Sequence, residues 1–288
     1  MKFMPVLSAA KRANQQGRED GGNRALIEQT SDESTRVQRF DEIWVHQIKA
    51  ALRENRFRLV HLPIACLNGE QRIMYDTLLR MIDAQGAEIA AAEFMPAAFR
   101  NRLLRAIDRW VVGASLSFCA RTQLDCAFVK LSSESLVDRT LVEWLAKAVE
   151  SSGVAPERLC FQVSEDDATQ YLTQTQALAQ ELNARGHRFA VEHFGIGRDS
   201  GRVLIQTPMQ YLKLDGSLME KLATDSAVQE KVRVYVGAAS KRGIPTIAER
   251  VENANTMAVL FQLGVAYVQG HYVHEPEVVL GDVATTRR

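Results

Sequence analysis

Short apolar runs alternate with long amphipathic stretches along most of the chain. Eight of the runs have the length and composition of β-strands. Apolar residues recur at helical spacing between most of them, which favours successive βα units and a parallel sheet. The predicted strands cover residues 57–64, 71–80, 126–131, 158–163, 187–194, 210–215, 244–250 and 265–270. This pattern predicts an α/β protein with a (β/α)8-type barrel.

The first two predicted strands differ from the others in the length of their connection. Only a short turn around Asn68 and Gly69 separates them. That spacing is typical of a β-hairpin rather than of a helical crossover. We therefore predict at least one antiparallel strand near the N-terminus.

The N-terminal part of the chain follows a different pattern. Residues 1–38 are rich in Gln, Arg, Asn, Gly, Ser and Glu and show no periodicity, so we expect a flexible arm. From Phe40 onward, apolar residues fall at helical spacing and predict an amphipathic lead-in helix over residues 39–56. The remaining residues, 57–288, form the predicted barrel domain.

The composition excludes several classes of function. The chain has 35 Lys+Arg and 35 Asp+Glu, so no overall field draws it to DNA, RNA or an anionic membrane. It has no apolar run long enough for membrane insertion and no secretory signal. Its four cysteines lack C-x-x-C spacing and are interpreted as reduced, mostly buried thiols. We expect a soluble cytoplasmic protein.

Several predicted strands carry a polar residue near the C-terminal end. A barrel gathers these ends on one face, where nearly all barrel enzymes build their sites. Each residue alone has an ordinary explanation, because strands must end in something polar, but their repetition around the barrel points to a site. They are Lys130, Gln162, Glu192 with His193, Lys213, Glu249 and Gln269.

Several ordered motifs resemble those of EAL domains, which bind and often hydrolyse cyclic di-GMP. They are FAVEHFGIG, QYLKLDGSL, IAERVENA and YVQGHYV, preceded by FRLVHLPI, YDTLLRM, EFMPAAF, AIDRWVV and VKLSSESL. The resemblance covers about residues 57–278. It implies an EAL-type (β/α)8-like (TIM) barrel.

In active members of this family, carboxylates and an asparagine hold two divalent cations, and a water that bridges them attacks the phosphodiester. Most of those positions differ in this chain. Carried over by position, the ligand set becomes Asp76, Lys130, Gln162, Glu192 and His193, and only Glu249 keeps the family residue. Other family residues are retained: Lys213 at the general-base or water-orienting lysine, Gln269, and Glu165 at the loop glutamate.

These substitutions predict loss of catalysis. Lys130 places an ammonium where a metal needs an oxygen ligand, and Gln162 removes a negative charge. Without metal ions, Lys213 has no activated water molecule to direct at the phosphodiester. We predict no catalytic residue, no divalent metal and negligible hydrolysis. Lys130 itself is a candidate replacement for a metal, with its ammonium among Asp76, Glu192 and Glu249; exposure of its ammonium to solvent is the alternative.

The positions that contact the nucleotide in this family are better preserved in this chain than the positions of the metal ligands. Arg80 matches an arginine that contacts a ligand phosphate, and Asp108 matches a carboxylate that pairs with a guanine edge. An exposed or salt-bridged helix residue is the alternative interpretation of Asp108. Arg250 stands where some receptors stack an aromatic ring on guanine, and an arginine plane can also stack. The predicted cyclic di-GMP set is Leu78, Arg80, Asp108, Lys213, Arg250, Glu252, Gln269 and Pro276.

This combination resembles the FimX-type subgroup, whose members bind cyclic di-GMP without cleaving it. The resemblance implies a bacterial cytoplasmic receptor, localised to a pole through its partners, with a PilZ-type protein partner and a role in type IV pilus assembly or twitching motility. Two alternatives remain. Leu62 and Glu275 depart from the family pattern and favour a protein-interaction module without nucleotide, whereas Lys213, Glu249 and Gln269 favour a weak phosphodiesterase. The sequence leaves open whether the protein forms a homodimer and whether the chain is a fragment.

Overall fold

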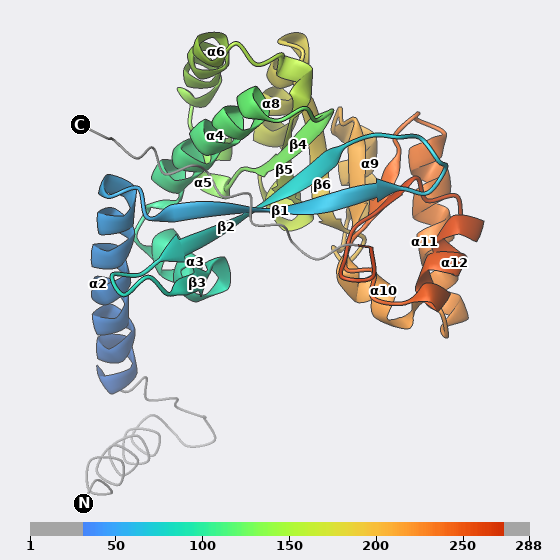
Figure 1. Ribbon diagram of the computed structural model, residues 1–288. Coiled ribbons are helices and arrows are strands. Elements are labelled where there is room, and N and C mark those ends of the chain that lie inside the picture. The colour runs from blue at the N-terminus through green and yellow to red at the C-terminus, as the bar shows by residue number, and fades with distance from the viewer. Residues whose placement is uncertain (1–30, 274–288) are drawn as a thin grey trace, which may run out of the picture.

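A closed barrel of eight strands forms the centre of the protein (Figure 1). The computed structural model describes residues 31–273, with side chains from residue 36 onward. The barrel strands are β1 (Phe57–Cys66), β2 (Met74–Ile82), β4 (Cys126–Lys130), β5 (Leu159–Ser164), β6 (Arg188–Phe194), β7 (Tyr211–Leu214), β8 (Thr246–Ala248) and β9 (Tyr267–Val268). Each of these overlaps one of the eight predicted strands, and the predicted α/β barrel is confirmed.

Strand β1 is the antiparallel member of the barrel. It pairs with β2 on one side and with β9 on the other, both antiparallel, whereas the ladder from β2 through β4 to β9 is parallel. Gly69, with φ +83°, lies in the loop between β1 and β2 in a backbone conformation that glycine adopts without strain. The predicted hairpin is therefore confirmed.

A further strand, β3 (Glu88–Ala90), extends the sheet outside the barrel. It pairs antiparallel with the part of β2 that projects beyond the barrel. The sequence pattern did not predict β3, because three residues are too few to show an alternation of apolar and polar positions.

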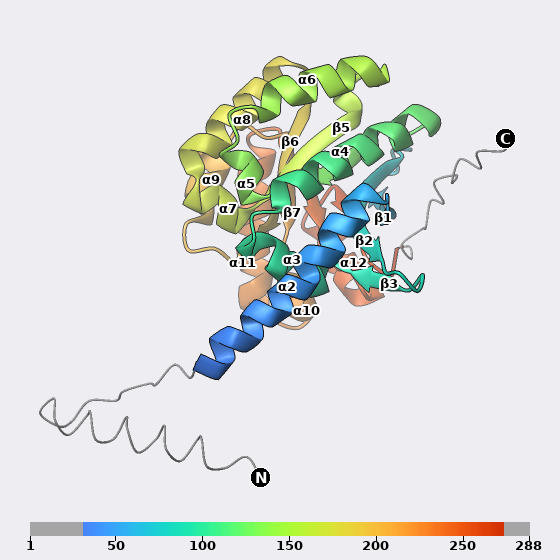
Figure 2. The ribbon, with the colours of Figure 1, turned by 90° about the vertical axis from the view of Figure 1, so that its left-hand side faces the viewer.

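Helices surround the barrel on its outside (Figures 1 and 2). They are α3 (Ala91–Arg100), α4 (Leu104–Arg121), α5 (Ser133–Leu136), α6 (Leu141–Ser152), α7 (Glu165–Gln170), α8 (Leu172–Ala184), α9 (Ser200–Gln206), α10 (Gly216–Leu222), α11 (Ser226–Ser240) and α12 (Ala254–Gln262), with a 3₁₀ turn at Pro156–Arg158.

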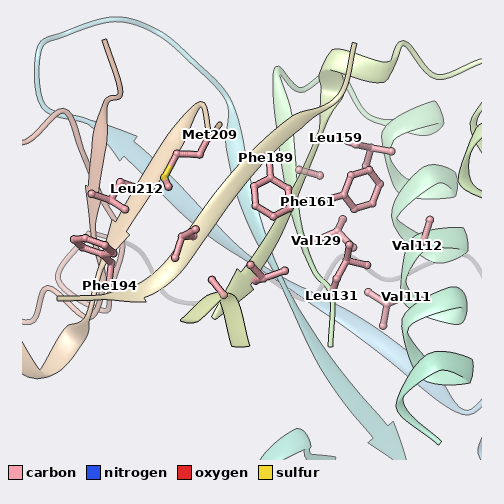
Figure 3. Close-up of a cluster of buried hydrophobic side chains, with 14 of the residues drawn as sticks. Val111, Val112, Val129, Leu131, Leu159, Phe161, Phe189, Phe194, Met209 and Leu212 are labelled. Carbon is pink, nitrogen blue, oxygen red and sulfur yellow. The ribbon is translucent and has the colours of Figure 1, made fainter. Parts of the chain in front are cut away.

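The core has two layers because successive residues of a strand face opposite sides. On β4, Val129 packs outward against α4, where Figure 3 shows Val111 and Val112 facing it. Phe128 faces the other way, into a cluster enclosed by the barrel. Because both faces of these strands are buried, successive residues are apolar, and this produces the near-continuous apolar runs of the sequence. All four cysteines are free and three are buried, consistent with a packing role.

The lead-in helix is longer than predicted. Helix α2 spans Ser31–Arg53, so residues 31–38, which we assigned to the flexible arm, are helical. The polar composition of this stretch suggested an arm, but acidic residues such as Asp32 and Glu33 also favour the first turn of a helix. The rest of the predicted arm lies outside the described residues.

Helix α2 is attached to α3 by an ion pair. Both oxygens of Asp41 accept hydrogen bonds from Arg100, at 2.6 and 2.9 Å, and Asn101 donates a third at 3.1 Å. This forked geometry is the strongest form of a carboxylate–arginine contact. Within residues 31–273, no helix is both long and apolar enough to cross a lipid bilayer.

A buried histidine predicts acid sensitivity of the fold. The ring of His61 is 2% exposed and stacks on Phe118 with centroids 3.7 Å apart, and neither ring nitrogen has a hydrogen-bond partner among the described residues. Burial lowers the pKa of His61 to about 4. The unfolded chain therefore takes up the proton first, and stability is full above about pH 6.5 and falls towards pH 4, by on the order of 3 kcal/mol.

Denaturant unfolding of His61→Phe between pH 7 and pH 4 measures this effect. The variant should lose less stability on acidification than the wild type. His46→Gln, at an exposed position, is the control and should leave the pH dependence unchanged. Equal acid loss in His61→Phe and wild type would contradict the assignment.

Candidate functional site

The polar residues at the strand ends converge at one mouth of the barrel, as predicted. Asp76 comes from β2, Gln162 from β5, Lys213 from β7, and Glu249 and Gln269 directly follow β8 and β9. All five side chains are buried. Parallel strands bring their C-terminal ends to the same edge, and this gathers residues far apart in the sequence.

The ammonium of Lys213 lies at the centre of this group. It is 0% exposed, and its Nζ lies 2.5 Å from Asp76 Oδ2 and 3.4 Å from Glu249 Oε1, and donates to Gln162 Oε1 at 3.1 Å. Burial opposes the charge, but Asp76 and Glu249 outweigh it and raise the pKa of Lys213. The lysine is therefore charged and fully paired.

Asp76 is in turn held on both carboxylate oxygens. Its Oδ1 accepts from Gln162 Nε2 at 2.8 Å, and its Oδ2 accepts from Gln269 Nε2 at 3.2 Å in addition to Lys213. The two glutamines thus orient Asp76, and Gln162 also joins it to the lysine, because its amide donates to Asp76 while accepting from Lys213.

Lys130 makes a second ion pair, and its position bears on both interpretations of this residue. Its Nζ lies 2.5 Å from Glu192 Oε1 and is also attracted by Asp76 and Glu249, but the ion pairs of those two carboxylates are with Lys213. The Lys130 side chain is 49% exposed, whereas that of Glu192 is 5% exposed. Burial opposes ionisation of both groups, yet their mutual attraction raises the pKa of Lys130 and lowers that of Glu192.

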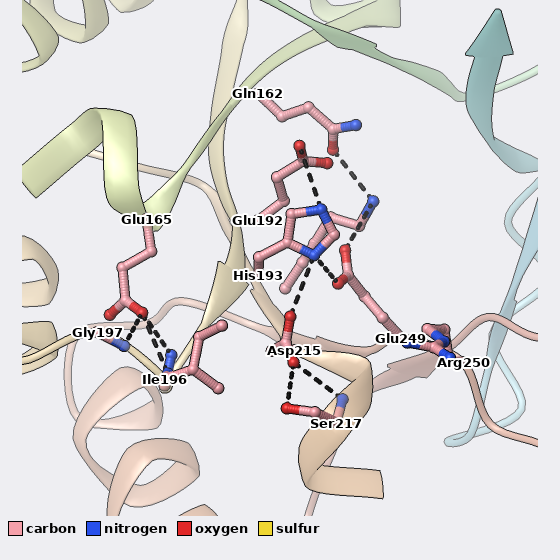
Figure 4. A network of polar contacts seen from close by, with 12 residues as sticks. Gln162, Glu165, Glu192, His193, Ile196, Gly197, Asp215, Ser217, Glu249 and Arg250 are labelled. Atoms are coloured by element: carbon pink, nitrogen blue, oxygen red, sulfur yellow. Dashed lines mark hydrogen bonds and ion pairs between the residues drawn. The ribbon is translucent and has the colours of Figure 1, made fainter. Parts of the chain in front are cut away.

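His193 is the third cationic side chain of the site. An irregularity in β6 positions it. The register of β6 against β7 shifts between Val191 and Phe194, and His193 has φ 53°, an unusual value for a residue other than glycine. Its ring then lies between carboxylates, with Nδ1 2.9 Å from Glu249 Oε2 and 3.3 Å from Asp215 Oδ2 (Figure 4). Contact with Glu249 raises the pKa of His193 to about 9, against the effect of burial.

Asp215 is the site residue that the sequence interpretation missed. It lies directly before α10 and caps that helix, where its Oδ1 accepts from the backbone and hydroxyl of Ser217 at 2.9 and 2.5 Å. Its position two residues after Lys213 at a strand end was the available signal. Candidate ligand atoms of His193, Asp215 and Glu249 lie within 4.8 Å of one another, so these residues are close enough to surround one cation.

Glu165 fixes the loop that follows His193. It is 2% exposed, and its Oε2 accepts from the backbone nitrogens of Gly195, Ile196 and Gly197 at 3.1, 3.2 and 2.7 Å (Figure 4). A Cβ at Gly197 would lie 2.8 Å from the Glu165 carboxylate, so the loop needs glycine there. The retained loop glutamate therefore has a clear structural function.

Arg80, the residue predicted to contact a phosphate, lies on β2 four residues after Asp76. Asp76, Leu78 and Arg80 alternate along one face of the strand, and the two outer residues, Leu78 and Arg80, are half-buried. Arg80 is not free, because its Nε lies 3.2 Å from Glu88 Oε1.

Asp108 is neither exposed nor salt-bridged, which corrects our alternative interpretation. It is buried, and its Oδ2 accepts from the backbone and hydroxyl of Ser132 at 2.9 and 2.6 Å and from the hydroxyl of Ser135 at 2.6 Å. Burial raises the pKa of Asp108 to about 6. These contacts tie α4 to α5, and pairing of Asp108 with guanine stays a prediction.

The last predicted contacts lie at the outer rim or beyond the described residues. Arg250 and Glu252 are exposed. Arg250 has φ 56°, and its side chain covers Gly216 so closely that a Cβ there would lie 2.4 Å from Arg250 Cδ. Pro276 lies outside the described residues.

Comparison with known proteins agrees with this geometry. The model of the EAL domain family matches residues 45–276. The FimX EAL domain of Pseudomonas aeruginosa bound to c-di-GMP is 35% identical, with a TM-score of 0.78 over 81% of this chain and 96% of that one. The FimX EAL domain of Xanthomonas citri in complex with c-di-GMP is 29% identical, with a TM-score of 0.78 over 85% of this chain and 96% of that one.

A curated relative points to enzymatic members of the same family. The cyclic di-GMP phosphodiesterase PdeB of Shewanella oneidensis is 30% identical over 262 residues, which cover 89% of this chain and 31% of PdeB. The chain thus spans about a third of the length of the curated relatives that it matches.

The contacts of His193 predict an elevated titration midpoint. In an NMR titration of the histidine rings, the signal lost in His193→Gln should titrate near pH 9 in the wild type, and Glu249→Gln should return it towards 6.5. Because the folded-state pKa lies above the unfolded value, this stabilisation is full below about pH 6.5 and is lost as the pH rises through 9. A wild-type midpoint near 6.5 would contradict the pairing.

Proposed function

The chain belongs to the EAL domain family of cyclic di-GMP phosphodiesterases, and on this premise we propose that it is a receptor that binds cyclic di-GMP without hydrolysing it. The likeness to FimX EAL domains solved with the nucleotide supports the ligand. The arrangement of charges at the barrel mouth supports the absence of hydrolysis.

The observation that carries the proposal is that the carboxylates of Asp76, Glu192 and Glu249 each already have a cation from the chain itself. Asp76 contacts Lys213, Glu192 contacts Lys130, and Glu249 contacts both Lys213 and His193. A pair of divalent cations would need the same oxygens and would lie beside the two ammonium groups. This donor set does not fit a metal pair, and without one no hydroxide forms at neutral pH.

The residues that remain are suited to holding an anion. Arg80 offers a guanidinium to one phosphate, and the half-exposed Lys130 adds positive charge at the mouth. Arg250 presents its guanidinium at the rim, where its side chain is 65% exposed and its ion pair with Glu220 is long at 3.9 Å. A planar cation in this position suits stacking on a guanine base.

A second candidate is a slow phosphodiesterase. The grouping of His193, Asp215 and Glu249 favours it, because one nitrogen and two carboxylate ligands suit a single transition-metal ion. Metal binding there would have to displace the proton of His193, whose pKa is raised to about 9.

The cellular role is also part of the proposal. We propose that nucleotide occupancy changes the affinity for a PilZ-type protein and thereby controls type IV pilus assembly or motility. The resemblance to FimX domains is the support. Such control requires that the nucleotide binds two states of the protein with different affinity.

Calorimetric titration with cyclic di-GMP, in EDTA and then in magnesium or manganese, tests the receptor function. We expect equal affinity in all buffers and recovery of intact nucleotide, because no step depends on a metal. Turnover in either metal would establish the phosphodiesterase instead. No binding in any buffer would leave the interaction module that lacks nucleotide.

Arg80→Ala tests the phosphate contact. Loss of a charge-assisted hydrogen bond should weaken binding about 10- to 100-fold. Arg72→Ala, in the loop before β2, removes the same charge and should leave the affinity within about two-fold. Equal weakening in both variants would show that only overall charge matters.

A further inference from the structure

The guanidinium of Arg80 is already engaged on two of its three nitrogens. Its Nε lies 3.2 Å from Glu88 Oε1, and its Nη1 donates to the carbonyl of Leu79 at 3.0 Å. A phosphate binds arginine best through two parallel donors. The Glu88 carboxylate therefore stands at the edge of the guanidinium that includes Nε, and a phosphate that takes two parallel donors at that edge must displace it. The carbonyl belongs to the backbone of β2, so Glu88 is the partner that can leave.

Glu88 is placed so that it can move. It is the first residue of β3, and its side chain is 45% exposed, against 26% for Arg80. Strand β3 has three residues and pairs with β2 alone among the described strands, with Glu88 opposite Ile82 and Ala90 opposite Arg80. A short edge strand opens locally at small cost compared with a central one.

We propose that Glu88 is an intramolecular competitor that occupies the phosphate-binding guanidinium of Arg80 until the nucleotide displaces it. This inference rests on the proposed function, because it takes Arg80 as the phosphate contact. A carboxylate and a phosphate oxygen recognise the same planar donors, so the two anions exclude each other at Arg80. Glu88 thereby weakens binding of any anion that does not bring enough other contacts.

Displacement has a structural consequence for β3. Once a phosphate holds Arg80, the Glu88 carboxylate faces a like charge and is driven outward. Helix α3 follows β3 directly and stays anchored to α2 through Asp41 with Arg100 and Asn101. The strain therefore falls on β3, whose backbone pairing with β2 should loosen in the bound state.

The test compares Glu88→Gln with Glu70→Gln. Glu70 is a matched control, because its Oε2 lies 3.3 Å from Arg72 Nε in a similarly exposed ion pair, but in the loop before β2, at the other end of the barrel. Both changes remove one negative charge. Calorimetric titration of the whole chain with cyclic di-GMP should show Glu88→Gln binding about two- to five-fold more tightly, the range expected for an exposed ion pair, and Glu70→Gln unchanged.

Hydrogen exchange provides a readout that a merely structural glutamate would not change. On addition of cyclic di-GMP, amides of residues 88–90 should exchange faster in the wild type, although a ligand usually slows exchange near its site. In Glu88→Gln the same amides should show no acceleration, because a neutral amide is not repelled by the phosphate. This difference separates displacement of Glu88 from a general change in stability.

The outcomes are distinct. Tighter binding by Glu88→Gln with loss of the β3 acceleration supports the competitor. Wild-type binding with unchanged or weaker affinity in Glu88→Gln overturns it, because Glu88 would then be inert or would orient Arg80, and leaves the receptor function intact. Equal tightening by Glu70→Gln also overturns it in favour of overall charge. No binding by the wild type or Glu88→Gln rejects the receptor function and the competitor together.

Discussion

A lysine ammonium buried at the mouth of the barrel is the constraint on which the site depends. Lys213 is inaccessible to solvent, and a buried charge is tolerated only if nearby groups compensate it. Asp76, Glu249 and Gln162 supply that compensation from three other strands or strand ends. The position of each of these side chains is therefore tied to the closure of the barrel. Removing Asp76 or Glu249 would leave the buried ammonium with one carboxylate instead of two.

The same electrostatic requirement explains the residues around this lysine. Glu192 is buried and takes its cation from Lys130, while Glu249 is shared between Lys213 and the ring of His193. The site thus neutralises most of its own carboxylates without an external ion. The guanidinium of Arg80 differs from these cations, because its carboxylate partner Glu88 is exposed. Under the proposed receptor function, affinity is set at the rim, where ion-pair partners can be exchanged, rather than among the buried carboxylates.

The elements outside the barrel connect this rim to the N-terminal helix. Strand β3 pairs beside Arg80, α3 continues from β3, and the Asp41 carboxylate of α2 holds the last turn of α3. The curated relatives are about three times longer than the stretch matched here. A helix attached in this way is a suitable connection between an EAL domain and a neighbouring domain or partner.

The sequence by itself determined the fold class and the composition of the site. Eight apolar runs predicted the barrel strands, the short Asn68–Gly69 connection predicted the hairpin, and polar strand ends indicated which residues meet. Local pattern carries this information because side-chain periodicity and turn chemistry act over a few residues. Only the tertiary structure decided which groups pair. Lys213 and Asp76 are 137 residues apart, and strand register rather than local pattern made Lys213, not Lys130, the cation for Asp76. The start of α2, the three residues of β3 and the contact between Glu88 and Arg80 were likewise decided by packing, since none of them leaves a periodic signal in the chain.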